Sequence, residues 1–181
     1  MNRNPVFFDL ETQNLFEDVG GRGNIARLRV ACAVTWSSIR EDFNVYWEKD
    51  VTSLITELRS ADRVIGFNIR GFDYEVLKPY TSAEALSSIP TLDLMENLSQ
   101  VLGFRPSLDS VASATLGVSK TADGVQSVQW FREGKLDQVA EYCKTDVDIT
   151  RRVFEFGMEN GYVNYLSKLG SRQRVRVDWS I

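Results

Sequence analysis

Residues 6–12, Val6-Phe7-Phe8-Asp9-Leu10-Glu11-Thr12, decide the expected fold of this chain. The apolar run before the first acid predicts a buried β-strand over residues 5–11. Side chains alternate along a strand, so Asp9 and Glu11 share one face and Leu10 points to the other. Two carboxylates about 4 Å apart repel each other by about 4 kcal/mol at an effective dielectric of 20. The strand therefore either ends in solvent here or presents its two acids to a partner.

The segments that follow this strand predict an α/β domain. Apolar runs indicate strands at residues 28–36, 42–47 and 63–67, with a loop at Arg22-Gly23-Asn24 and a hairpin turn at residues 39–42. Asp50 is the expected N-cap of the first of five helices, which helical spacing places at residues 51–59, 72–77, 92–102, 108–116 and 136–158. The alternating residues 174–179 indicate an edge strand. This order predicts one domain over residues 1–181, with a mixed central β-sheet flanked by α-helices.

Composition places the chain among ordinary globular proteins. Its 181 residues, 43% of them hydrophobic, suffice for one domain with a full core. No stretch has the roughly 18 uninterrupted apolar residues of a membrane helix, and residues 1–5 do not resemble a signal peptide. We therefore expect a soluble, cytoplasmic protein with no membrane partner. Cys32 and Cys143 form no CxxC pair, which favours buried free thiols over a disulfide.

The sequence contains no histidine. This excludes zinc sites with imidazole ligands and nucleophile pairs that use histidine as the base. Catalysis must then come from carboxylates, hydroxyls, lysines or a bound metal. The formal net charge is −4. Phosphate contacts usually make nucleic-acid-binding proteins basic, so this charge disfavours broad duplex binding and is compatible with a small site for a nucleic-acid end.

A second acidic position follows the strand predicted at residues 63–67. The segment Gly66-Phe67-Asn68-Ile69-Arg70-Gly71-Phe72-Asp73 takes the chain through a turn to the start of the next helix. Taken alone, Asp73 is typical of an N-cap or first-turn acid, which the helix dipole favours. Asn68 is equally typical of a turn residue that bonds the local backbone.

The third acidic position lies on the long C-terminal helix. At about 100° per residue, Tyr142 and Asp146 lie one turn apart along a shoulder of its apolar stripe. Asp148 falls well off that stripe and is expected to be solvated. The pattern alone leaves Tyr142 as either a functional group or an aromatic side chain at the edge of the core.

Taken in order, these three clusters resemble the DEDD superfamily of 3′–5′ exonucleases, which has a ribonuclease H-like fold. That family has Asp-x-Glu on the first strand, Asn followed by Phe-Asp after a later strand, and an aromatic residue or histidine with Asp near the C-terminus. The corresponding residues here are Asp9-Leu10-Glu11, then Asn68 with Phe72-Asp73, then Tyr142 with Asp146. Tyrosine four residues before the last aspartate resembles the tyrosine branch, known from polymerase proofreading domains. The resemblance covers residues 5 to about 155.

The resemblance implies hydrolysis of phosphodiester bonds with two divalent cations, Mg²⁺ or Mn²⁺, which prefer hard oxygen ligands. Asp9 would bridge both ions, while Glu11 and Asp146 would complete the coordination of the ion that holds the nucleophilic water. Asp73 would act on the leaving-group side. Tyr142 would orient the attacking water, because a phenol with a pKa near 10 is a poor general base at neutral pH.

The expected substrate is the 3′ end of single-stranded nucleic acid, with DNA slightly favoured over RNA. Leu10 would wedge against the terminal base, and Thr12 and Asn68 are candidate contacts to the end nucleotide. Lys120 is a candidate phosphate contact, for which an exposed loop lysine is the simpler interpretation. The glycine cluster at residues 20–23 is a flexible loop that would approach the strand together with Arg27 and Arg29.

Three arginines recur at every second position near the C-terminus, at Arg172, Arg174 and Arg176. They share one face of the expected edge strand, where a solvated edge that prevents aggregation is favoured over a nucleic-acid path. A repair, polymerase or helicase protein is a candidate partner. The main alternative function is a catalytically silent nuclease-like module that binds nucleic acid or a partner protein, and endonuclease action is a third.

Overall fold

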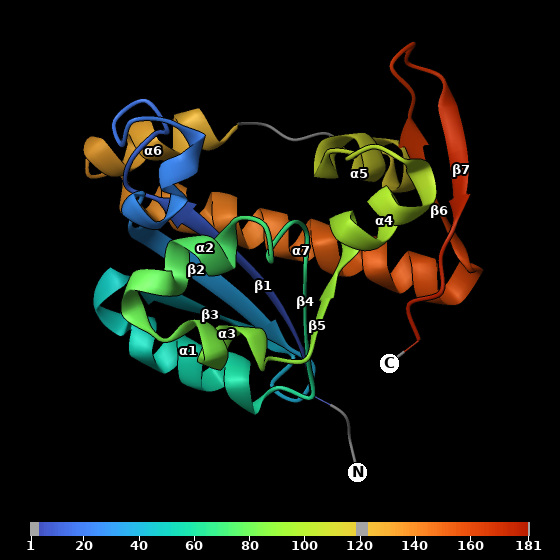
Figure 1. Ribbon diagram of the computed structural model, residues 1–181. Helices are drawn as coiled ribbons and strands as arrows, with labels where there is room; N and C mark the ends of the chain where they lie inside the picture. Colours follow the sequence, from blue (N-terminus) through green and yellow to red (C-terminus); the bar gives the residue numbers. More distant parts are fainter. Residues whose placement is uncertain (1–3, 119–122, 181) are drawn as a thin grey trace.

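The computed structural model describes residues 4–118 and 123–180. Its centre is a five-stranded mixed sheet in the order β3-β2-β1-β4-β5 (Figure 1). The strands are β1 (Pro5–Thr12), β2 (Val30–Ser37), β3 (Asp42–Trp47), β4 (Arg63–Gly66) and β5 (Thr91–Asp93). The middle strand, β1, is antiparallel to β2 and parallel to β4. The mixed α/β sheet that the sequence predicts is thereby confirmed.

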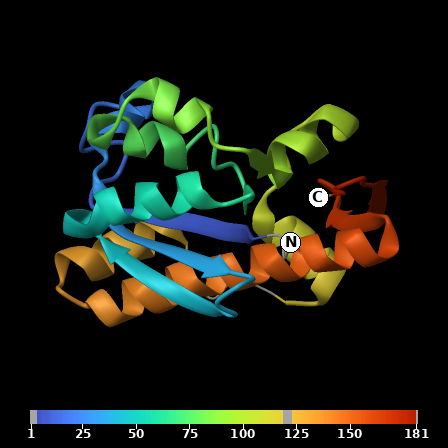
Figure 2. The ribbon, with the colours of Figure 1, turned by 90° about the horizontal axis from the view of Figure 1, so that it is seen from below.

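Helices cover both faces of this sheet, and Figure 2 shows the sheet between α1 and α7. The α-helices are α1 (Val51–Ser60), α2 (Asp73–Leu77), α3 (Ala83–Ser87), α4 (Leu94–Leu102), α5 (Leu108–Leu116), α6 (Gly124–Arg132) and α7 (Leu136–Asn160). The described residues also form the short 3₁₀ turns η1 (Arg22–Arg27), η2 (Glu48–Asp50) and η3 (Lys78–Tyr80). Within residues 4–118 and 123–180, no helix is long and apolar enough to cross a bilayer.

The alternation of side chains along β1 divides the interior into two cores. Val6, Phe8 and Leu10 pack into the core that contains the buried residues of α1 and α2. Phe7 packs into the core that contains the buried residues of α7. Because side chains of the same parity share a face, Asp9 and Glu11 continue the Phe7 face and point toward α7.

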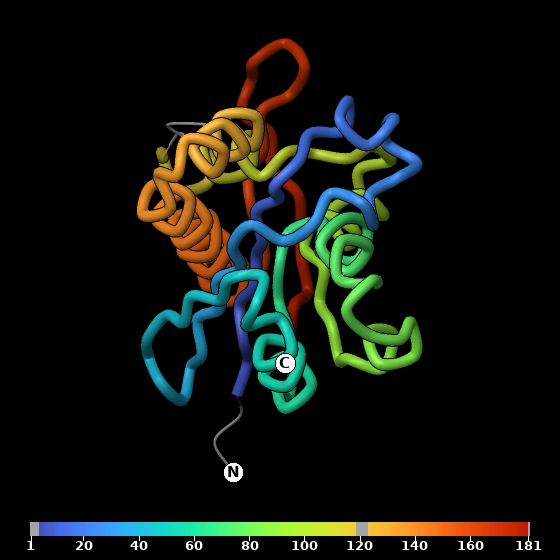
Figure 3. The backbone as a smooth tube through the Cα atoms, turned by 90° about the vertical axis from the view of Figure 1, so that its left-hand side faces the viewer, coloured from blue at the N-terminus to red at the C-terminus, as the bar shows by residue number. Residues whose placement is uncertain are grey.

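The C-terminal end of β1 is where the functional elements meet. The connection after β1 and helix α6 both lie at that end in Figure 3. Helices α6 and α7 both contact β1, and α7 also contacts β2. The acids of β1, Asp9 and Glu11, therefore lie at a site bounded by α6, α7 and the connection after β1.

A separate hairpin follows α7. It consists of β6 (Tyr162–Leu166) and β7 (Arg172–Arg176), paired antiparallel, and it packs against α5 (Figure 1). Gly161, with φ of 71°, ends α7 in the left-handed conformation that favours glycine. The chain then returns along α7, where a Cβ on Gly157 would lie 2.4 Å from the Trp179 ring. Glycine is required there for the tail to pack.

Several local predictions need correction. The segment from residue 92, expected to be entirely helical, begins as strand β5. Helix α4 starts only after Asp93, because the Asp93 carboxylate caps it by accepting hydrogen bonds from the N–H groups of Met95 and Glu96. The expected loop at Arg22-Gly23-Asn24 lies within η1. Asp50 precedes α1, but its carboxylate accepts from Trp47 N–H at 3.3 Å instead of capping α1. The terminal strand spans residues 172–176, not 174–179.

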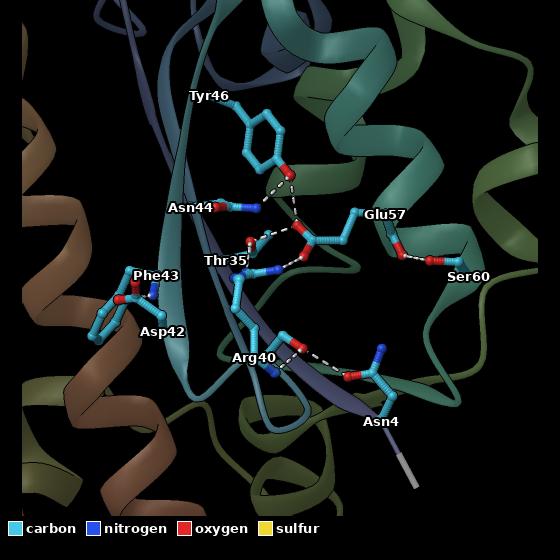
Figure 4. Close-up of polar contacts among 10 residues, drawn as sticks. Asn4, Thr35, Arg40, Asp42, Phe43, Asn44, Tyr46, Glu57 and Ser60 are labelled. Carbon is cyan, nitrogen blue, oxygen red and sulfur yellow. Dashed lines mark hydrogen bonds and ion pairs between the residues drawn. The ribbon is translucent and has the colours of Figure 1, made fainter. Parts of the chain in front are cut away.

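A polar network on the α1 side of the sheet holds a mostly buried glutamate (Figure 4). The hydroxyls of Thr35 and Tyr46 donate to Glu57 Oε2 at 2.6 and 2.8 Å, and Arg40 donates to Oε1 at 2.8 Å. Asn44 in turn donates to the Tyr46 hydroxyl at 3.2 Å. Glu57 is therefore a carboxylate whose oxygens are satisfied by donors from β2, β3 and the turn between them.

Candidate active site

Three carboxylates from two elements converge beside the end of β1. One carboxylate oxygen from each of Asp9, Glu11 and Asp146 lies within 4.8 Å of the other two. Glu11 and Asp146 are 8% and 5% exposed, so two of the three are almost removed from water. Like charges at this separation and burial repel strongly, and hard oxygen donors are the ligands that Mg²⁺ and Mn²⁺ prefer. The donor set therefore fits a divalent cation.

Asp73 stands beside this group as the first residue of α2, and it is 3% exposed. Its Oδ1 accepts a hydrogen bond of 3.0 Å from the backbone N–H of Leu10, the residue between Asp9 and Glu11. Burial, followed by the charge of Asp9, raises the pKa of Asp73 well above its ordinary value of 3.8. The fourth acid is thus fixed to the backbone of the strand that carries the first two.

Tyr142 lies one turn before Asp146 on α7 and is 8% exposed. Its ring contacts Trp130 of α6 edge to face, with centroids 6.2 Å apart. Burial raises the pKa of the Tyr142 phenol above its ordinary value of 10, and the charges of Asp146 and Glu11 raise it further. The phenol is therefore protonated at neutral pH.

A thiol lies beneath the carboxylates. Cys143 Sγ is 3.3 Å from the backbone oxygen of Asp9 and 3.6 Å from its Oδ2. Burial, followed by a hydrogen bond with Cys32, raises the pKa of the Cys143 thiol well above its usual range. Both cysteines are free and buried, as predicted. The protonated thiol thus supports Asp9 as a weak donor.

The acids open into a cavity of about 420 Å³. Asp9, Glu11, Asp73 and Asp146 line it together with Leu10, Thr12 and Asn68, so seven of the nine residues chosen from the sequence meet at one cavity. Tyr142 lies outside the lining, although its pKa responds to Asp146, Glu11 and Asp9. Lys120 lies outside the described residues.

Other residues that line this cavity were not proposed as substrate contacts from the sequence. Phe16 and Phe72 line it with rings 6.1 Å apart, and the Arg22 guanidinium lies 4.9 Å from the centroid of the Phe16 ring. Helix α6 contributes Val125 and Val128. The glycine cluster is part of the connection that carries Phe16 and Arg22. Arg29, by contrast, pairs with Glu48 at 2.7 Å.

A second cavity of about 290 Å³ adjoins the first, because Asp9 and Asp146 line both. Its walls include Asn68 and the exposed Arg105, whose guanidinium donates to Asn68 Oδ1 at 2.6 Å. The Asn68 backbone has φ of 68°, and its N–H donates to Asp93 Oδ1 at 2.8 Å. Asn68 is thus a turn residue and a cavity residue at once. Sequence reasoning missed Arg105, because a loop arginine carries no local signal.

Asp148 separates from the site as predicted from its place on the helix. Its carboxylate is 33% exposed and forms ion pairs with Arg151 at 2.7 Å and Arg152 at 3.8 Å. Asp146 and Asp148 are therefore only two residues apart on α7, yet Asp146 faces other carboxylates and Asp148 faces arginines.

Comparison with known families agrees with this geometry. The family model RNase_H_2, described as RNase_H superfamily, matches residues 6–156 and so includes every acid of the site. The chain belongs to the RNase_H superfamily. Among curated proteins, none matches the chain.

A solved structure has the same superfamily fold. The chain is similar to E. coli exonuclease I in complex with a 5cy-dT13 oligonucleotide, with a TM-score of 0.52 and 12% sequence identity. The similarity covers 88% of this chain and 41% of exonuclease I. At this identity the likeness shows the fold alone. The ribonuclease H-like fold of this chain thus also occurs in an exonuclease.

Proposed function

We propose that the protein is a metal-dependent 3′–5′ exonuclease of the tyrosine branch of the DEDD group, acting on single-stranded ends. The convergence of Asp9, Glu11 and Asp146 within 4.8 Å at the wall of a cavity carries the proposal. Membership of the RNase_H superfamily supports it. Exonuclease I, which has the same fold, was solved with a DNA oligonucleotide, and we place DNA ahead of RNA as the substrate.

Asp9, Glu11 and Asp146 would hold the cations, with Asp73 beside them. Two divalent ions supply an activated water and stabilise the departing oxygen in this class of hydrolysis. Asp73 is fixed by Leu10 N–H, so it acts from a constant position relative to β1. The proposed set includes only oxygen ligands, which matches Mg²⁺ or Mn²⁺.

Tyr142 acts by orienting water rather than by removing its proton. Its raised pKa keeps the hydroxyl protonated, and a protonated phenol donates or accepts hydrogen bonds without serving as a base. The Trp130 ring restricts the position of the Tyr142 ring from the α6 side. A fixed hydroxyl one turn from Asp146 suits a group that positions the nucleophile.

The two cavities divide the substrate between them. The larger one has an aromatic and aliphatic wall from Phe16, Phe72 and Leu10, which suits the terminal base. The smaller one is polar on its Asn68 and Arg105 side, which suits a phosphate. The acids shared by both cavities then face the linkage between the last two nucleotides.

The direct test uses 5′-labelled single-stranded DNA and RNA of equal length, with Mg²⁺, Mn²⁺ or EDTA. We expect a ladder that shortens from the 3′ end with either metal and is absent in EDTA. The Asp9→Ala variant is the inactive control. A circular single strand, which has no end, is expected to stay intact.

Two results would contradict the proposal. Cleavage of the circular strand would assign an endonuclease. An intact linear strand under every metal, with binding retained, would assign a catalytically silent module that binds nucleic acid.

A further inference from the structure

The exposed face of β7 carries a row of arginines. Arg172, Arg174 and Arg176 alternate with Gln173 and Val175, so the three arginines share one face. Val175, on the other face, is 5% exposed and packs into the core with Val163 of β6. The arginine face is therefore directed away from the core.

All three arginines of this row are exposed. None of them forms an ion pair with an acid in the described part of the chain. The whole chain has a formal net charge of −4. The three arginines thus form a local positive surface on a five-residue strand, although the protein as a whole is acidic.

The spacing and order of the row suit a phosphate backbone. Alternate residues of a strand are about 7 Å apart, which is comparable to the separation of successive phosphates in an extended single strand. The Arg174 guanidinium lies 3.8 Å from the centroid of the Tyr162 ring on the same face. Stacking fixes the plane of this guanidinium and leaves its N–H groups for an anion.

The row is also held rigidly relative to the proposed active site. Ser110 of α5 accepts from Leu166 N–H at 3.0 Å and donates to Leu166 O at 3.2 Å. Thr115 makes the same pair of bonds with Asn164, at 2.9 and 2.8 Å. Helix α5 begins at Leu108, which lines the smaller cavity next to Arg105. One helix therefore connects the hairpin to the cavity.

We infer that the Arg172–Arg174–Arg176 face binds the phosphates of single-stranded nucleic acid upstream of the 3′ end held at the carboxylates. This inference extends the proposed function to a second contact with the same strand. It predicts that long strands bind more tightly than the few nucleotides that fill the two cavities. It also predicts that the difference depends on salt.

The test is equilibrium binding of fluorescein-labelled dT20 and dT4 in EDTA, measured by anisotropy at several salt concentrations. The variant is Arg172→Gln/Arg174→Gln/Arg176→Gln. A charge-matched control, Lys49→Gln/Arg59→Gln/Lys78→Gln, removes three exposed cations from the region of η2, α1 and η3. Unchanged thermal unfolding and circular dichroism establish that each variant is folded.

We expect the β7 variant to bind dT20 about tenfold more weakly at low salt, and to reduce the magnitude of the slope of log affinity against log salt by about 2. Its affinity for dT4 and its metal-dependent cleavage of dT4 should equal those of the wild type. Arg174→Lys, which keeps the charge and loses the stacking plane, should fall between the variant and the wild type.

Three results would overturn the inference. The first is an equal loss of affinity for dT4 and dT20, and the second is a wild type that binds neither strand. The third is a loss of dT20 affinity no greater than that of the control, which would identify the row as protection of an exposed strand edge. Tight dT20 binding without any metal-dependent cleavage would refute the proposed exonuclease and leave the arginine contact standing.

Discussion

The two sides of the sheet each hold mostly buried carboxylates, and these carboxylates differ in the side chains that surround them. On the α1 side of the sheet, Glu57 accepts hydrogen bonds from Thr35, Tyr46 and Arg40 (Figure 4). On the α7 side, one carboxylate oxygen from each of Asp9, Glu11 and Asp146 lies within 4.8 Å of the other two. Glu57 faces hydroxyl and guanidinium donors, whereas each acid of the second group faces other carboxylates. Surroundings, rather than burial, therefore distinguish Glu57 from the acids that we propose as a metal centre.

Neutralising one acid of each group should give the largest contrast in activity. Because a metal ion supplies several kcal/mol of transition-state stabilisation, Asp146→Asn should lower kcat/KM for a single-stranded oligonucleotide by about 10³-fold or more. Glu57→Gln should leave it within about twofold. The measurement is initial-rate kinetics with Mn²⁺. Equal losses in both variants would mean that the two groups do not differ in function.

The tyrosines of the two groups offer a smaller contrast. Tyr142→Phe removes the hydroxyl proposed to orient water and should lower kcat by about 10- to 100-fold with little change in stability. Tyr46→Phe removes a donor to Glu57 and should cost about 1 kcal/mol of unfolding free energy, with kcat unchanged. Single-turnover rates and denaturant unfolding, measured on both variants, give the comparison. An unaltered kcat in Tyr142→Phe would remove this residue from the mechanism.

In EDTA, replacing an acid of each group should change the unfolding free energy in opposite directions. Glu57→Ala leaves the buried Thr35 hydroxyl without its acceptor and should lower the unfolding free energy by about 2 kcal/mol. Glu11→Gln removes one of three like charges that converge within 4.8 Å and should raise the unfolding free energy. Urea unfolding of metal-free protein measures both. A loss of stability in Glu11→Gln would contradict a net repulsion among the three acids.

The smallest expected effect is on the pH dependence of stability, which should have opposite signs for an acid whose pKa is raised and for one whose pKa is lowered. The pKa of Asp73 is raised by burial and by Asp9, so its contribution to stability is present below its ordinary value of 3.8 and is lost as the pH rises through the raised value. In EDTA, Asp73→Asn should therefore match the wild type below pH 3.8 and become the more stable protein as the pH rises.

Glu48 provides the internal control for that titration. Burial raises its pKa, but hydrogen bonds from Arg29, Tyr80 and Gln13 outweigh burial and lower it below its ordinary value of 4.5. Its contribution is present above pH 4.5 and is lost as the pH falls through the lowered value. Glu48→Gln should therefore be less stable than the wild type at neutral pH and converge with it in acid. The same sign for both variants would contradict the contrast.

The sequence predicted the parts of the fold that have strong periodicity. Alternation around Asp9 identified β1 and its two faces, and spacing on α7 separated Asp146 from Asp148. The mixed sheet followed from the order of these segments. Such features were predictable because each depends on neighbours within one element.

Short elements and long-range contacts were not predictable in this way. Strand β5 has only three residues and is recognisable through its pairing with β4. Helix α6 begins at Gly124, a poor helix former, with Asp123 as the cap that signals it. Arg105 reaches Asn68 across 37 residues of sequence. Strand β5 and the Arg105 contact depend on tertiary contacts that a local pattern does not encode, whereas the local signal of α6, its cap Asp123, was missed.

Calorimetric titration of Mn²⁺ into metal-free protein tests the central claim most directly. We predict that the wild type and Glu57→Gln bind Mn²⁺ with the same stoichiometry and affinity. Asp9→Asn, which removes a charge from the three converging carboxylates, should bind at least about tenfold more weakly. Equal binding by the wild type and Asp9→Asn, or no binding by the wild type, would contradict the assignment of these acids as a metal centre.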